Sequence, residues 1–150
     1  GGGGGVVDIF HRGVPEVKLE VKGVERFGTF KGNELAFLSM GLDADLGGAF
    51  SWNTKMVFMY VEAEWETPLN KRNQVVLWDR VIENREEGVL KLPNLRNHAD
   101  SPLADQGAHL LGRDINVTVS WNVIPHIGKL YTAHKSFPFK MPDQYIRPYE

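Results

Sequence analysis

The chain has 150 residues, of which 42% are hydrophobic, 24% charged and 11% aromatic, which is typical of one ordinary soluble globular domain. Its 17 Lys and Arg and 19 Asp and Glu give a net charge of −2, so it lacks the positive field on which nucleic-acid binders depend. The absence of Cys excludes a thiolate nucleophile, a disulfide framework and a Cys-based metal site. We therefore expect no nucleic-acid partner and no cofactor.

Five glycines open the chain, and we expect residues 1–15 to form a linker, natural or engineered, ahead of a single domain at residues 16–150. The start has neither the basic residues nor the apolar run of a signal peptide. The longest stretch without Asp, Glu, Lys or Arg, residues 115–128, is shorter than a bilayer span and contains Asn, Thr, Ser and Pro. Any membrane anchor is expected upstream of this sequence.

Alternation of apolar and polar residues is the strongest pattern in the chain, and it predicts half-buried strands. It is cleanest around Val117, Val119 and Trp121, which share one face while Asn116 and Thr118 share the other. The turn-rich residues 68–72 separate two of the predicted strands and favour an antiparallel hairpin. The predicted strands cover residues 17–22, 35–44, 56–65, 75–82, 115–123 and 130–134.

About six strands with few helical patterns predict an all-β fold, namely an antiparallel β-sandwich. Residues 93–112 show no periodicity and are expected to form a long irregular loop. From Ser136 onward, Pro138, Pro142 and Pro148 predict an extended, proline-rich C-terminal tail, which can lie over a sheet but cannot sit in its middle.

Candidates for catalysis are weak. Ser120 and Asn122 share the polar face of one strand, but no glycine-framed nucleophile elbow surrounds any Ser, so we assign no catalytic residue. An independent hydrolase remains a third hypothesis, which requires activity from the purified chain.

A metal site can be drawn from imidazole and carboxylate groups in the irregular region. The alternative is a solvated polar loop, which we favour, and we assign no metal ligand. The four residues concerned are His98, Asp100, Asp105 and His109.

Asn116, Val117 and Thr118 form the only N-glycosylation sequon. The alternation places Asn116 on the face away from Val117 and Val119, so its amide is expected to point to solvent, as a glycan requires. Asn116 is therefore the predicted glycosylation site.

Four tryptophans are many for this length, and exposed aromatic side chains on β-sandwiches can bind sugars. Trp65 and Trp121 follow the apolar faces of their strands and are expected to be buried. Trp52 and Trp78 leave a second hypothesis open, an extracellular carbohydrate-binding or adhesion β-sandwich, which a glycan array would test.

Several segments, in the same order along the chain, resemble the lumenal domain of the third, non-catalytic subunit of the eukaryotic signal peptidase complex. The resemblance extends over residues 16–145. It rests on Phe50-Ser51-Trp52-Asn53-Thr54-Lys55 with Phe58, Tyr60, Ala63 and Glu64, then Asn73-Gln74-Val75-Val76-Leu77-Trp78-Asp79, Asn116-Val117-Thr118-Val119-Ser120-Trp121-Asn122-Val123 with Pro125, and Phe137-Pro138-Phe139 with Pro142, Asp143 and Tyr145.

The resemblance implies an accessory subunit that supplies no catalytic residue, binds the catalytic signal peptidase subunit and other subunits of the complex, and supports removal of signal peptides. Family members begin with one transmembrane helix, which is replaced here by glycines. The implied full-length protein is a single-pass type II glycoprotein of the endoplasmic reticulum membrane with this domain on the lumenal side. Asn116 falls on the family's glycosylated sequon.

Where such a subunit would touch its partners cannot be read from alternation. The C-terminal tail is our hypothesis, because it keeps apolar groups on a segment too rich in proline for a core strand. The alternative is that these groups close the open end of the sandwich. The residues expected to bind a partner are Phe137, Phe139, Met141 and Tyr145.

Overall fold

The computed structural model describes residues 15–68, 72–107 and 109–149 of the chain. Most of the expected linker, residues 1–14, lies outside the described residues. Two short 3-10 turns, η1 (Gly47–Ala49) and η2 (Glu86–Gly88), interrupt an otherwise all-strand structure. The strands are β1 (Glu16–Phe30), β2 (Asn33–Asp45), β3 (Thr54–Trp65), β4 (Asn73–Ile82), β5 (Val89–Arg96), β6 (Leu103–Gln106), β7 (Asp114–Pro125) and β8 (Tyr131–Lys140).

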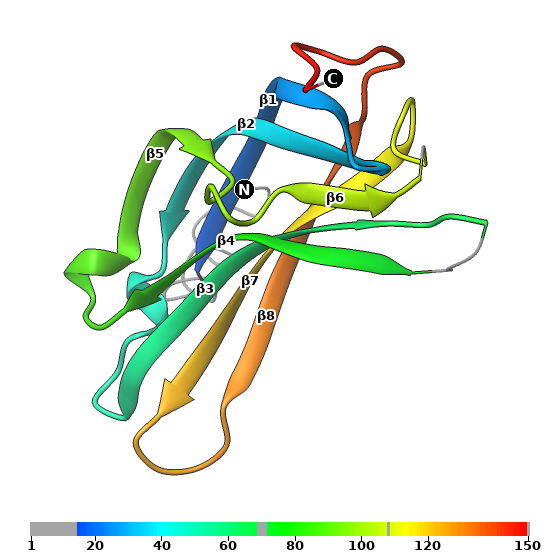
Figure 1. Ribbon diagram of the computed structural model, residues 1–150. Coiled ribbons are helices and arrows are strands. Elements are labelled where there is room, and N and C mark those ends of the chain that lie inside the picture. The colour runs from blue at the N-terminus through cyan, green and yellow to red at the C-terminus, as the bar shows by residue number, and fades with distance from the viewer. Residues whose placement is uncertain (1–14, 69–71, 108, 150) are drawn as a thin grey trace, which may run out of the picture.

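The strands form two antiparallel sheets that pack face to face (Figure 1). In the first sheet β2 is central, with β1 on one side and with β5 and β6 along successive parts of the other side. The second sheet has the order β4-β3-β7-β8. The predicted all-β antiparallel sandwich is thus confirmed. Among the described residues, no helix has the length and hydropathy needed to cross a bilayer.

The β1–β2 hairpin follows from its two-residue turn. Lys31 and Gly32 both have positive φ values, 52° and 85°, as a type I′ turn requires. The pairing then runs from Phe30 opposite Asn33 to Glu16 opposite Asp45, with two irregularities near Gly23. Such irregularities bend a strand, so β1 can follow the curve of β2 along its whole length.

The core is built from the alternate residues of both sheets, as the sequence pattern predicts. Ala36, Leu38 and Met40 of β2 face Val57, Met59 and Val61 of β3, and all six are completely buried. The partner strands add Val117, Val119 and Trp121 of β7. One hydrophobic cluster therefore joins the two sheets.

The predicted long loop is shorter than expected. β5 extends to Arg96, and β6 lies inside residues 93–112, where no strand was predicted. The buried amide of Asn97 fixes the loop between these two strands to β2, since it accepts a hydrogen bond from the Leu38 N–H and donates to the carbonyls of Ala36 and Ser101. Hydrogen bonds from a side chain to β2 therefore hold this region in place, although its sequence shows no strand periodicity.

The C-terminal region also differs from expectation. β8 continues through Pro138 to Lys140, so the tail begins five residues later than Ser136. Pro138 fits because β8 is an edge strand that pairs with β7 alone. Residues 141–149, here called the C-terminal segment, then cross back to β1, where Phe27 and Ile146 exchange backbone hydrogen bonds of 2.8 and 2.9 Å (Figure 1).

Gly28 allows this crossing. A Cβ atom at this position would lie 2.8 Å from the Pro148 Cα and 2.9 Å from the Tyr149 nitrogen, both backbone atoms. Only glycine therefore lets the C-terminal segment approach β1 so closely.

One histidine bonds to the free side of β4. The His98 N–H donates to the carbonyl of Leu77 at 2.9 Å, and the His98 Nε2 accepts a hydrogen bond of 3.3 Å from the Asp79 N–H. The His98 ring also lies beside Trp78, with the ring centres 6.4 Å apart. The loop between β5 and β6 is thereby attached to the edge of the second sheet.

Candidate functional site

Asn116 lies on β7 with an exposed side chain, on the face turned away from the core. Its neighbours across the sheet are Glu64 of β3 and Pro138 of β8. The sequon hydroxyl of Thr118 is buried and lies 2.9 Å from the Ser136 hydroxyl. The predicted acceptor amide is therefore exposed in the folded domain, whereas the threonine of its sequon is buried.

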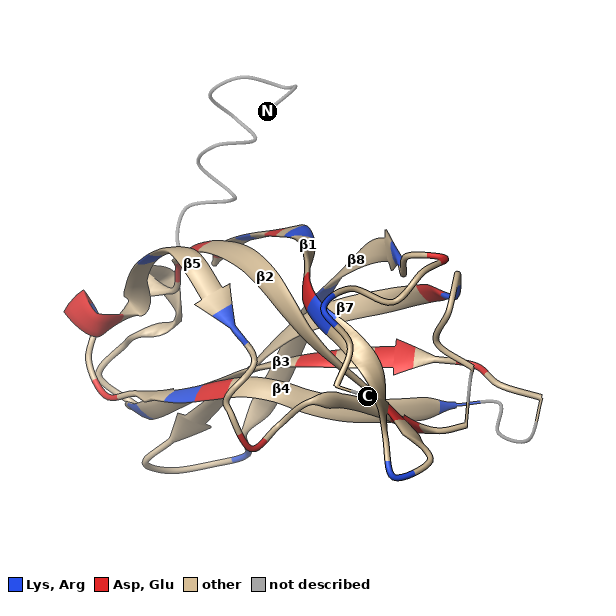
Figure 2. Cartoon of the chain, turned by 45° about the horizontal axis from the view of Figure 1, so that its top comes forward, with Lys and Arg blue, Asp and Glu red and all other residues tan. Residues whose placement is uncertain are grey.

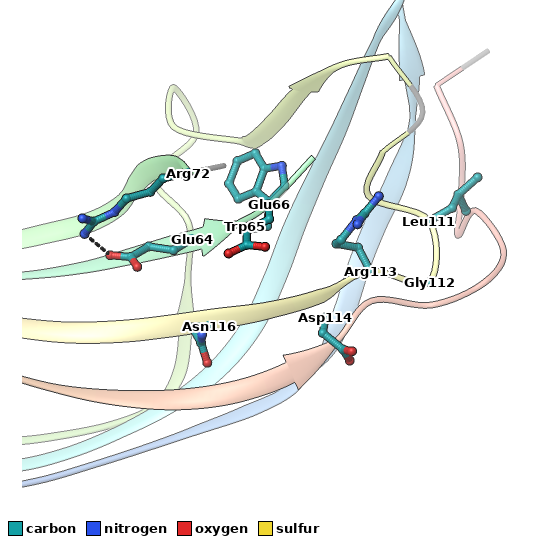
Figure 3. A pocket seen from close by; sticks show the side chains of 9 residues that line it. All are labelled: Glu64, Trp65, Glu66, Arg72, Leu111, Gly112, Arg113, Asp114 and Asn116. Carbon is teal, nitrogen blue, oxygen red and sulfur yellow. Dashed lines mark hydrogen bonds and ion pairs between the residues drawn. The ribbon is translucent and has the colours of Figure 1, made fainter. Parts of the chain in front are cut away.

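An open pocket of about 660 Å³ surrounds this position, between the end of β3 and the start of β7 (Figure 3). Arg72 and Glu64 form an ion pair of 3.2 Å at its rim, and the Arg72 side chain is 71% exposed. Arg113, Asp114 and Asn116 project from β7 and the turn before it. The Glu64 side chain is 26% exposed, so the ion pair joins a solvated cation to a partly buried carboxylate at the rim of an open surface pocket.

Two carboxylates lie near each other on this outer face. Burial raises the pKa of Glu62, and the negative charge of Glu64 raises it further. Arg72 and His134 act in the opposite direction.

Opposite charges of Lys, Arg, Asp and Glu are distributed over both sheets, with carboxylates conspicuous at η2 and at the end of β3 (Figure 2).

The C-terminal residues expected to bind a partner pack against the core. Phe137 and Phe139 lie opposite Val117 and Ile115 of β7 and are half-buried. The Met141 side chain is only 1% exposed. This packing favours the alternative, closure of the sandwich, and the partner-binding role of these residues stays a hypothesis.

Tyr145 belongs to a buried polar network that alternation alone did not reveal. Its hydroxyl donates a 2.8 Å hydrogen bond to Glu34, and the Leu110 N–H donates one of 2.7 Å to the other oxygen of the same carboxylate. Glu34 is completely buried, and the Tyr145 ring meets Phe27 edge-on at 5.0 Å. Burial, then the hydrogen bond and charge of Glu34, raise the pKa of Tyr145 to about 12.

The sequence did contain a signal for Glu34. It is two residues before Ala36, so it shares the inward phase of Ala36, Leu38 and Met40. A carboxylate in that phase needs hydrogen-bond donors from elsewhere in the chain. Residues Leu110 and Tyr145, which provide them, could not be identified without the fold.

The four candidate metal ligands do not form one cluster but make separate contacts. Asp105 accepts hydrogen bonds from the Trp65 Nε1 at 3.3 Å and lies 2.8 Å from the His109 Nδ1. His98 bonds to β4, and Asp100 bonds to its neighbour Ser101. Within residues 15–68, 72–107 and 109–149, no three His, Asp or Glu side chains form a metal-binding group.

The candidate nucleophile Ser120 is buried, in the middle of β7 opposite Tyr60 and His134. Three of the four tryptophans are also buried: Trp65 and Trp121, as expected, and Trp78. Trp52 is 87% exposed, in the turn before β3. An exposed tryptophan is unusual enough to call for an explanation, since this large side chain is normally mostly buried.

Comparison with known proteins gives a consistent result. The family model described as signal peptidase subunit matches residues 7–144. Three relatives are each named signal peptidase complex subunit 3. The Dictyostelium discoideum protein is 34% identical over 134 residues, 88% of this chain and 76% of its own length. The Drosophila melanogaster protein is 35% identical over 86% of this chain and 73% of its own length, and the Homo sapiens protein is 37% identical over 85% and 72%.

Proposed function

Because the chain belongs to the signal peptidase subunit family, we propose that it is a non-catalytic accessory subunit of the signal peptidase complex. The family match, which extends over nearly the whole sandwich, carries this proposal and agrees with the resemblance seen in the sequence. In this role the domain binds the catalytic subunit and supports removal of signal peptides from secretory proteins. It acts on the lumenal side of the endoplasmic reticulum and follows an N-terminal transmembrane helix of the full-length protein.

The chemistry of the described residues supports a structural role. Glu34 and Asp105, the two buried carboxylates, are both occupied by donors from distant parts of the chain. Their hydrogen bonds hold loops and the C-terminal segment in place. Such interactions make a rigid surface for other subunits.

The proposal is tested by affinity purification of the full-length, membrane-anchored protein from detergent-solubilised endoplasmic reticulum. We expect stoichiometric recovery of a Ser-dependent peptidase, identified by mass spectrometry, and signal-peptide cleavage in the eluate. The control is the same anchor carrying an unrelated domain. Recovery of the chain alone and without activity would contradict the proposal.

We also propose that Asn116 carries an N-linked glycan. Its support is the exposed acceptor amide beside the open pocket. Expression in the endoplasmic reticulum should give a band that a glycosidase shifts, and Asn116→Gln should abolish that shift. Asn122→Gln, on the same strand but outside a sequon, is the matched control and should leave it intact.

The C-terminal aromatic residues are the proposed contact with the catalytic subunit. Phe139→Asp separates this role from closure of the sandwich. Loss of subunit recovery at an unchanged melting temperature supports the contact, whereas a lower melting temperature of the isolated domain with normal recovery supports closure alone. Phe30→Asp, on an exposed aromatic of the β1–β2 turn, is the control.

A further inference from the structure

Exposed apolar side chains gather at one end of the sandwich. They belong to the turn before β3, to the turn between β7 and β8 and to the first residue of β8, and the pairing of Thr54 with Pro125 brings the two turns together at the bottom of Figure 1. We call this set the apolar tip. It consists of Trp52, Ile127, Leu130 and Tyr131, which are 87%, 75%, 56% and 52% exposed.

Hydrogen bonds fix these two turns to each other. The Asn53 Nδ2 donates to the Ile127 carbonyl at 2.9 Å, and the Ile127 N–H donates to the Asn53 Oδ1 at 3.1 Å. The His126 N–H donates to the Asn53 carbonyl at 2.8 Å. These hydrogen bonds fix the two turns, so Trp52 and Ile127 are held in their exposed positions.

Lysines lie in or next to the two turns that form the tip, whereas acidic residues lie only before the turn that precedes β3 and in η2 beside it. Residues 46–55 and 125–131 contain Lys55 and Lys129 and no Asp or Glu. Both lysine side chains are exposed. The acidic turn η2 lies apart from the β7–β8 turn in both Figure 1 and Figure 2, but it adjoins the start of the turn before β3, where the Leu46 N–H donates to the Gly88 carbonyl at 2.9 Å. The tip thus joins aromatic and aliphatic groups to cationic ones.

We propose that the apolar tip inserts into the interfacial layer of a lipid bilayer that contains anionic lipids. Trp and Tyr favour the boundary between headgroups and acyl chains, and lysines beside them are attracted to anionic headgroups. Protruding turns enter a deformable lipid layer without a matching surface, which a folded protein partner would have to supply. This inference goes beyond the proposed function, because it concerns the domain itself and not an anchor.

The test uses the 150-residue chain and large unilamellar vesicles of phosphatidylcholine, with or without phosphatidylinositol. Because Trp65, Trp78 and Trp121 are at most 6% exposed, a shift of the emission to shorter wavelength on vesicle addition reports chiefly on Trp52. We expect this shift, and co-flotation of the chain, with the anionic vesicles. Trp52→Ala and Ile127→Ser should each weaken flotation by roughly tenfold.

Charge is tested separately, because Lys129→Gln should weaken binding to the anionic vesicles by about fivefold and leave binding to neutral vesicles unchanged. Phe30→Ser removes an exposed aromatic side chain at the other end of the sandwich and should bind as the unchanged chain does. Absence of the emission shift, or equal flotation of Trp52→Ala, would overturn the proposal. If Trp52→Ala instead loses subunit recovery from membranes while vesicle flotation is unaffected, the tip contacts protein, and the lipid proposal is wrong although the accessory-subunit role stands.

Discussion

At one end of the sandwich a carboxylate is completely buried, whereas at the other a tryptophan is almost completely exposed. The first end contains Glu34, at the start of β2, and is closed by the C-terminal segment. The second lies beyond the end of β2, where the turns of the apolar tip meet. Both ends are held by hydrogen bonds, around Glu34 and around Asn53.

Hydrogen bonding serves a different purpose at each of the two ends. Around Glu34 it satisfies a charge that burial has removed from water, so loss of any partner is costly. Around Asn53 it fixes the shape of turns whose apolar side chains gain little from folding. Stability should therefore depend on the first end, and the proposed contact with lipid on the second.

Glu34→Ala should have the largest effect. It leaves the buried Leu110 N–H without its acceptor and opens a cavity, so we expect a loss of about 3 kcal/mol in the free energy of unfolding. Urea denaturation measures the change. Glu20→Ala, on an exposed position of β1, should stay within about 0.5 kcal/mol. Equal effects of the two substitutions would remove the contrast between the ends.

Asn97→Ala extends the comparison along the first sheet. The Asn97 amide forms hydrogen bonds with the Leu38 N–H and two carbonyls, so we expect a loss of about 2 kcal/mol in the free energy of unfolding, measured by urea denaturation. Asn94→Ala, an exposed neighbour on β5, is the control and should be nearly neutral. A neutral Asn97→Ala would show that burial of polar groups is critical only at the closed end.

Tyr145→Phe should cost about 1.5 kcal/mol at neutral pH, because one hydrogen bond to the Glu34 carboxylate is lost. The pKa of Tyr145 is raised from 10.0 to about 12 in the folded chain, so the folded state holds its proton more tightly than the unfolded state. The resulting stability is fully present below pH 10 and declines as the pH rises toward 12. Unfolding measured across this range should show a steeper decline for the unchanged chain than for Tyr145→Phe. Parallel declines would contradict the coupling.

Trp52→Ala should have the smallest effect, within about 0.5 kcal/mol, because the side chain is 87% exposed. Thermal unfolding of the isolated domain checks this. Trp121→Ala, at a buried tryptophan of β7, should lose about 3 kcal/mol, as much as Glu34→Ala. A large loss for Trp52→Ala would mean that the apolar tip is part of the core.

Alternation predicted β3 and β7 well, because each presents one continuous face to the core, but it ended the first strand at residue 22 although β1 runs to Phe30, since burial no longer alternates there. It failed for β5 and β6, where Pro93 and Asn94 break the pattern and β6 has only four residues. The exposure of Trp52 could not be predicted either, because alternation indicates which way a residue faces only within a strand.

The candidate site was predictable in part. The orientation of Asn116 follows from period two and a single strand. The contacts of Tyr145 do not, because Glu34 and Phe27 are more than a hundred residues away in the chain. Local patterns determine which way a strand residue faces, whereas the fold determines which distant residue meets it.

The contact of His98 with β4 has a consequence for solubility. An edge strand with free N–H and carbonyl groups is a template on which another chain can add a strand and start aggregation. Here the Leu77 carbonyl and the Asp79 N–H already have partners in His98, in the middle of that edge. The histidine therefore blocks addition of another strand in the middle of this edge.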